Sequence, residues 1–92
     1  MDRSYVVTGG GRGVGRAIVE RLLKDAEYNA VVAIELDSDA LAWMEDHTSS
    51  PRAISIIGDA SDEAVAERAA DLAEETGTLS GWVNNAAVFR DT

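Results

Sequence analysis

Residues 6–15 read Val-Val-Thr-Gly-Gly-Gly-Arg-Gly-Val-Gly, and this stretch decides the fold. An apolar, β-branched run precedes the glycines, and apolar residues recur at helical spacing after them, from residue 16 to residue 23. That order predicts a strand, a glycine turn and a helix. Glycines permit positive φ and let a ligand approach the backbone, and the N-terminus of the next helix favours an anion. The stretch is therefore predicted to hold a phosphate or pyrophosphate.

The alternative is a flexible glycine turn without a ligand. Five of the eight glycines lie between positions 9 and 15. An ordinary strand-to-helix turn needs only about one or two glycines, because each additional one costs conformational entropy on folding. The clustering therefore favours a binding loop.

Spacing excludes two common phosphate loops. A Walker-type loop needs Lys and then Ser or Thr after its last glycine, but Arg16 and Ala17 stand there. The dinucleotide pattern Gly-x-Gly-x-x-Gly/Ala also fails. Counted from Gly9 its third position is Val14, and counted from Gly11 it is Arg16.

The spacing that fits is Thr-Gly-x-x-x-Gly-x-Gly, which begins at Thr8. This motif resembles the cofactor loop of the short-chain dehydrogenase/reductase family, whose members bind NAD or NADP on a Rossmann fold. The resemblance implies that the loop holds the pyrophosphate and the adenosine end of the dinucleotide. The residues that this assigns to cofactor binding are Gly9, Gly11, Arg12, Gly13, Val14 and Gly15.

Size, charge and composition argue against several other classes of protein. The chain has 92 residues, so it makes at most one small domain. Its formal net charge is −9, which argues against binding to nucleic acid or to an anionic membrane surface. No apolar run approaches the ~20 residues of a membrane-spanning helix, and there is no cysteine for a disulfide or a thiolate metal site. A soluble, cytoplasmic protein without a metal is expected.

Strands and helices are predicted to alternate along the chain. Apolar runs predict strands at residues 4–8, 30–36, 52–58 and 82–87. Helical periodicity predicts three helices. They lie at 14–26, at a segment capped by Asp37 or Ser38 that runs to about 47, and at a segment up to 76 that is capped by Ser61 and ended by Gly77. The order βαβαβαβ without hairpin signals predicts an α/β fold, namely a Rossmann-type parallel sheet with flanking helices, of which these are the first four strands.

Glu35 lies near the carboxyl end of the second predicted strand, 20 residues after Gly15. In dinucleotide-binding folds, an acid near this place accepts hydrogen bonds from the adenosine ribose. A solvated acid at a strand end is the alternative, and the glycine loop favours the binding role. Asp37 is a second candidate, although it is equally plausible as a helix cap.

Three residues bear on the choice between NAD and NADP. In the family, a basic residue just before the second motif glycine often accompanies NADP, and Arg12 stands there. Glu35 would repel the 2′-phosphate of NADP, and Leu36 occupies the place where NADP-preferring relatives often have arginine. NAD is therefore predicted, and NADP stays the alternative because of Arg12.

Two further segments resemble cofactor motifs of the family. Asp59 and Ala60 follow the third predicted strand and resemble its Asp-Val or Asp-Leu pair, which implies contacts with adenine. A helix-leading aspartate is the alternative. Residues 84–87 read Asn-Asn-Ala-Ala and resemble Asn-Asn-Ala-Gly, which implies that Asn85, Ala86 and Ala87 line the nicotinamide ribose, although an alanine replaces the final glycine at position 87. Adjacent buried asparagines also need partners, because an unpaired buried amide costs about 1–3 kcal/mol.

The family's catalytic Tyr-x-x-x-Lys does not occur in these 92 residues. Tyr5 and Tyr28 are followed four residues later by Gly9 and Val32, and the only lysine is Lys24. The resemblance covers essentially the whole chain but corresponds to the amino-terminal, cofactor-binding part of a family member. It implies an intact oxidoreductase that transfers a hydride between the nicotinamide and a carbonyl or alcohol substrate. This chain alone is expected to be inactive.

The fourth strand is expected to form an exposed apolar edge, and such edges invite pairing. A partner is therefore predicted, either another copy or a carboxyl-terminal half. The alternative function is a stand-alone, non-catalytic dinucleotide-binding or scaffolding module. Trp43 and Trp82 are expected to fill core or surface positions.

Overall fold

The computed structural model describes residues 3–9, 13–25, 29–37, 39, 42–45 and 52–85. Four parallel strands form one sheet in the order β3-β2-β1-β4. The strands are β1 (Arg3–Thr8), β2 (Asn29–Glu35), β3 (Ala53–Ile57) and β4 (Thr78–Asn84). The helices are α1 (Gly13–Asp25), α2 (Ala42–Glu45) and α3 (Glu63–Thr76). The predicted α/β, Rossmann-type sheet is confirmed.

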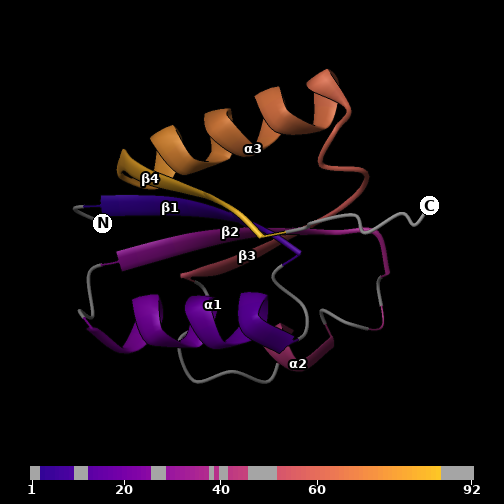
Figure 1. Ribbon diagram of the computed structural model, residues 1–92. Helices are drawn as coiled ribbons and strands as arrows, with labels where there is room; N and C mark the ends of the chain where they lie inside the picture. The colour runs from indigo at the N-terminus through magenta and orange to yellow at the C-terminus, as the bar shows by residue number, and fades with distance from the viewer. Residues whose placement is uncertain are drawn as a thin grey trace.

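The sheet lies between two helical layers, with α1 and α2 on one face and α3 on the other (Figure 1). Because successive strand residues point to opposite faces, neighbouring valines of β1 enter different cores. One core lies under α1 and consists of Val7, Val19, Leu23, Val31 and Ala33. The other lies under α3 and consists of Val6, Val32, Ile34, Ile56, Ala69 and Ala73. The interior strand β2 is buried from Asn29 to Ile34, as expected for a strand covered on both faces.

β4 begins earlier than the sequence predicts. It starts at Thr78, four residues before the predicted Trp82, and pairs with β1 from Arg3 onward. Residues 78–81 read Thr-Leu-Ser-Gly, and a glycine inside a strand resembles a turn signal. The structure gives Gly81 a packing reason instead, because a Cβ there would come within 2.8 Å of the Tyr5 ring. The strand also ends earlier, at Asn84, and residues 86 and 87 lie outside the described part.

The cap of α3 also differs from the prediction by one residue. The Asp62 carboxylate accepts a hydrogen bond from the Ala64 amide at 2.9 Å, so Asp62 and not Ser61 is the N-cap. The Ser61 hydroxyl instead donates to Asp59 Oδ1 at 2.7 Å. The predicted end at Gly77 is confirmed, since its amide donates to the Ala73 carbonyl at 2.9 Å.

The predicted second helix coincides with α2 only over Ala42–Glu45, and residues 38, 40, 41, 46 and 47 lie outside the described part. Asp37 lies five residues before the start of α2. Its Oδ1 accepts from the Asp39 amide at 2.9 Å, a bond that stabilises a local turn. Among the described residues, no helix is long and apolar enough to cross a membrane.

Residues outside α1 donate hydrogen bonds to the carbonyls at its carboxyl end. The last carbonyls of a helix have no partner within the helix. Asn29 donates from Nδ2 to the Leu22 carbonyl at 2.8 Å. Arg52, just before β3, donates to the carbonyls of Leu23 at 3.3 Å and Asn29 at 2.6 Å. One guanidinium thus joins α1, β2 and the entry to β3.

We expect Arg52→Met to lower the free energy of unfolding by about 2 kcal/mol, because it removes charge-assisted hydrogen bonds and leaves two carbonyls without this donor. Urea denaturation followed by tryptophan fluorescence measures the change. Arg68→Met, at an exposed position of α3, is the matched control and should change stability by less than about 0.5 kcal/mol. Equal stability of the two variants would contradict the capping role.

Candidate functional site

The predicted site residues gather where the strands of the sheet end. β1 lies between β2 and β4, and the chain leaves it for α1 on one face, whereas α3 leads into β4 from the other face (Figure 1). In open α/β sheets, such a reversal leaves a crevice beyond the carboxyl ends of the strands, where ligands bind. The end of β1 is therefore the centre of the candidate site.

Two glycines of the loop have the left-handed backbone that favours glycine. Gly9 has φ of 66° and Gly13 has φ of 59°, and no other described residue has a positive φ. Gly9 follows β1 directly and donates its amide to the Ile34 carbonyl at 2.7 Å. Gly13 begins α1, and a Cβ there would meet nothing within 4 Å. Two of the site residues predicted in this loop, Gly11 and Arg12, lie outside the described residues.

Gly15 is the most crowded position of the site. A Cβ on this residue would collide with the Gly9 carbonyl oxygen and would lie 2.6 Å from Asn85 Nδ2. The same Nδ2 donates to the Gly9 carbonyl at 3.4 Å. The first turn of α1 therefore lies directly against the end of β1 and the residue after β4.

Thr8 completes this junction. Its Oγ1 accepts from the Asn85 amide at 2.9 Å and donates to the Val83 carbonyl at 3.3 Å. The glycine motif and the asparagine motif are thus bonded to each other across 77 residues of sequence. Asn85 is half-buried, whereas Asn84 is exposed and accepts from Trp82 Nε1 at 3.0 Å. The expectation of two buried asparagines is therefore wrong for Asn84.

The start of α1 has an electrostatic character that α3 lacks. α3 begins with the Asp62 cap and with Glu63, and these acids offset the positive end of its dipole. The first turn of α1 contains no acidic residue. Its positive end faces the glycine loop, as an anion site requires. Val14, in the same turn, is 67% exposed.

The residues predicted to meet the ribose lie together at the end of β2. Glu35 is half-buried, and its Oε2 accepts from the Leu36 amide at 3.2 Å. Leu36 is 69% exposed, and Asp37 is also exposed. Carboxylates and an open apolar side chain therefore stand beside the glycine loop.

Asp59 organises the turn between β3 and α3. Its Oδ1 accepts from the Ser61 amide at 2.9 Å and from the Ser61 hydroxyl, while its backbone carbonyl accepts from the Asp62 amide at 3.0 Å. Ala60 packs against the core under α3. Through these contacts Asp59 leads into α3, which is the alternative role that the sequence offers. Adenine binding by Asp59 and Ala60 stays a prediction. Ala86 and Ala87 lie outside the described residues.

Sequence reasoning missed one contact beside the site. The Arg16 guanidinium lies over the Trp43 ring at 4.5 Å from its centroid, a cation–π geometry. Arg16 follows Gly15 on α1, and Trp43 belongs to α2 and packs against the core under α1. No local pattern relates residues 27 positions apart, so the sequence held no signal for this pair.

The sequence matches the family model described as short chain dehydrogenase over residues 3–92. The chain therefore belongs to the short-chain dehydrogenase family, a class of oxidoreductases. Sorbitol dehydrogenase of Cereibacter sphaeroides is 32% identical over 88 residues, which are 95% of this chain and 33% of that protein. The 3-oxoacyl-(acyl-carrier-protein) reductase FabG of Chlamydia muridarum is 29% identical over 97 residues, which are 100% of this chain and 38% of that protein.

Solved structures agree with this assignment. The crystal structure of the KRED1-Pglu enzyme has a TM-score of 0.83 at 29% identity, with 97% of this chain and 37% of that one covered. A 3-hydroxyacyl-CoA dehydrogenase type-2 from Mycobacterium avium has a TM-score of 0.83 at 28% identity, with 95% and 33% covered. The chain spans 33% to 38% of the length of the two curated relatives.

We expect Gly15→Ala to destabilise the fold by about 3 kcal/mol, because the added methyl group meets a backbone oxygen that cannot rotate away. Chemical denaturation measures this loss. Gly13→Asn is the control, since its Cβ has open space and asparagine tolerates positive φ. If both variants unfold like the unchanged chain, the close packing at Gly15 does not constrain the fold.

Proposed function

We propose that this chain supplies the dinucleotide-binding part of an NAD-dependent oxidoreductase of the short-chain dehydrogenase type. The observation that carries the proposal is the junction of Gly9, Gly15 and Asn85 at the start of α1, where a Cβ on Gly15 has no room. Such close packing brings helix amides to the loop, and the first turn offers them without an acidic competitor. When bound, the nicotinamide would supply or accept the hydride, and a carbonyl or alcohol compound would be the substrate.

The proposed roles follow the chain. The pyrophosphate would lie at residues 9–15 and the adenosine ribose at Glu35. Adenine would lie at Asp59 and Ala60. The nicotinamide ribose would lie at Asn85, Ala86 and Ala87. Residues 1–92 would thus form a partial NAD(P)-binding Rossmann domain of a longer cytoplasmic enzyme.

NAD is the proposed cofactor because of the charges that follow β2. Residues 35–41 include three acids, Glu35, Asp37 and Asp39, and no basic residue. The 2′-phosphate of NADP would meet these carboxylates if the ribose lies at Glu35. Arg12 is the residue that would offset the repulsion, and it is the reason to test NADP alongside NAD.

The chemical step would depend on polypeptide beyond these residues. The 92 residues contain no Tyr-x-x-x-Lys, so the proposed general acid–base pair has to come from elsewhere in the intact protein. By itself the chain is proposed to bind the dinucleotide without turning over a substrate.

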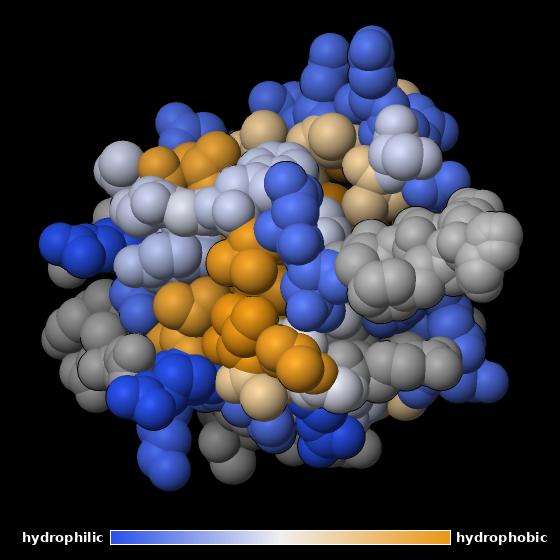
Figure 2. All heavy atoms as spheres, in the orientation of Figure 1, coloured by the Kyte–Doolittle hydropathy of each residue, from blue (hydrophilic) through white to orange (hydrophobic). Residues whose placement is uncertain are grey.

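A partner is proposed for β4. Within the described sheet β4 lies at an edge, and none of its seven residues is buried. The strand carries no charged side chain that would discourage pairing. Figure 2 shows apolar surface gathered between β4 and α1. Separately, Ile18, Leu22 and Val83 are only partly buried where they pack against the core under α1. The carboxyl-terminal part of an intact protein, or another copy, would cover this surface.

Isothermal titration of the purified chain with NAD tests the proposed function, and we expect saturable binding that is weaker for NADP. Glu35→Gln should raise the affinity for NADP about tenfold, because it removes a charge beside the 2′-phosphate. Glu63→Gln on α3 removes the same charge at a distant position and should leave both affinities unchanged. Absence of NAD binding would refute the proposal. Binding by a chain shown to work without a partner would support the stand-alone module.

Native mass spectrometry tests the partner. We expect a mass above the 9.8 kDa of one chain, from a second polypeptide or a second copy. Ser80→Lys, at an exposed position of β4, should shift the chain to a monomer, because lysine protects an open edge. The control Ser55→Lys introduces a lysine at an exposed position of β3 and should leave the assembly intact. A stable 9.8 kDa species from the unchanged chain would contradict the partner.

A further inference from the structure

The contact between Arg16 and Trp43 joins the two segments to which the proposed function assigns the phosphates and the ribose. Arg16 lies in the first turn of α1, next to Gly15. Trp43 lies in α2, beyond the connection that begins at Glu35. The guanidinium centre is 4.5 Å from the ring centroid, and Arg16 Nε also lies 3.6 Å from Glu20 Oε2.

α2 depends on contacts of this kind. Four residues form one turn, which is too short to be stable as an isolated helix. In the described part, α2 lies beside the start of α1 (Figure 1), and the Trp43 ring packs against the core under α1. The stacked guanidinium adds a directional contact on the side chain of Arg16, which also pairs with Glu20. Trp43 and Arg16 therefore fix where α2 lies relative to the start of α1.

The position of α2 controls the freedom of the residues before it. One end of the connection is fixed at Glu35, whose carbonyl accepts from the Gly58 amide at 2.9 Å. The other end is fixed by α2. Leu36, Asp37 and Asp39 lie between them, and all three are exposed. A segment held at both ends loses less entropy when a ligand orders it, which strengthens binding without a new ligand contact.

We propose that the stacking of Arg16 on Trp43 is a positioning contact that holds the residues after β2 ready for the adenosine ribose. Neither side chain is assigned a contact with the ligand. The inference rests on the proposed function, since it names residues that tune the same site.

Amide hydrogen exchange tests the positioning without a ligand. In Arg16→Met and in Trp43→Leu, the amides of Leu36, Asp37 and Asp39 should exchange at least about fivefold faster. Glu20→Gln removes only the ion pair and should leave these rates unchanged. Arg16→Lys and Trp43→Phe keep a cation and an aromatic face, so each should recover most of the protection. Unchanged exchange in the two disruptive variants would overturn the inference.

Binding of NAD and of AMP provides the second measurement. Each disruptive variant should weaken both ligands by the same factor, about fivefold to tenfold, because AMP contains the adenosine half. The double variant should be no weaker than Trp43→Leu alone, as expected if Arg16 acts only through the contact that Trp43 shares with it. Ile18→Val, a truncation elsewhere on the α1 side, should lower stability without changing either affinity.

The outcomes separate the two proposals. If the unchanged chain binds neither NAD nor AMP, the proposed function and this inference both fail. If the unchanged chain binds both, and Arg16→Met and Trp43→Leu bind them equally well, only the positioning role fails. A loss of NAD affinity without a loss of AMP affinity would also overturn it, because the effect would then lie outside the adenosine half.

Discussion

The fit of Gly15 against the Gly9 carbonyl and Asn85 is the constraint on which the rest of the site depends. It requires a residue without Cβ in the first turn of α1, and it fixes how closely the helix approaches the sheet. Thr8 then bonds the end of β1 to the residue after β4. The end of β1, the first turn of α1 and the residue after β4 are therefore held together by this close contact and by the hydrogen bonds of Thr8.

The sequence predicts the parts of this structure that depend on local pattern. Apolar runs identify β1, β2 and β3 to within about one residue. Such runs are typical of strands covered on both faces, as β2 is, although β3 is buried only at Ile56. The glycine loop is also predictable, because Gly9 and Gly13 have a positive φ, which other residues avoid. The sequence also shows that the first turn of α1 lacks an acidic residue, whereas α3 begins with Asp62 and Glu63.

Features set by tertiary contacts are the ones that the sequence does not predict. Gly81 looks like a turn residue, yet it lies inside β4 because the Tyr5 ring occupies the space of its side chain. Ser61 and Asp62 are both good caps, and the choice between them depends on Asp59, which takes the Ser61 hydroxyl. The pair of Arg16 and Trp43 arises only once α2 has docked beside α1.

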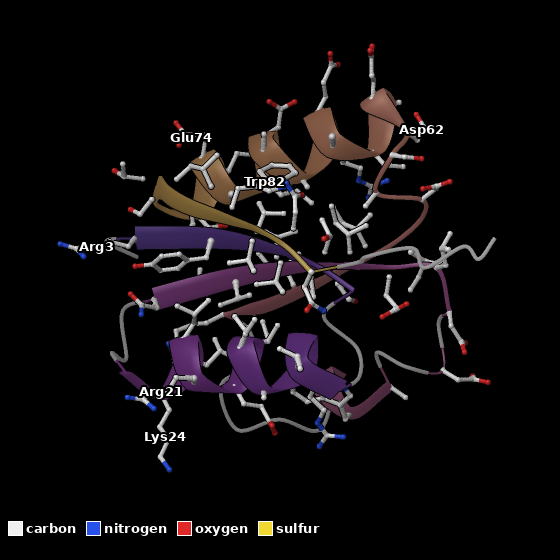
Figure 3. All side chains as sticks on the ribbon, viewed as in Figure 1. Arg3, Arg21, Lys24, Asp62, Glu74 and Trp82 are labelled. Atoms are coloured by element: carbon white, nitrogen blue, oxygen red, sulfur yellow. The ribbon has the colours of Figure 1, made fainter. Side chains whose placement is uncertain are left out.

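Some surface side chains extend into solvent, whereas others bond to a neighbouring element. Arg21 and Lys24 extend from α1 into solvent (Figure 3), whereas the Glu74 carboxylate of α3 accepts from the Leu79 amide of β4 at 2.6 Å. Arg52 makes a comparable connection at the far end of α1. Asn29 supplies a nearby donor to the last turn of the first helix, but the guanidinium of Arg52 reaches the Leu23 carbonyl only once the third strand has paired. Completion of the helix is thereby coupled to assembly of the sheet, since detachment of β3 would remove this donor and favour fraying at the end of α1.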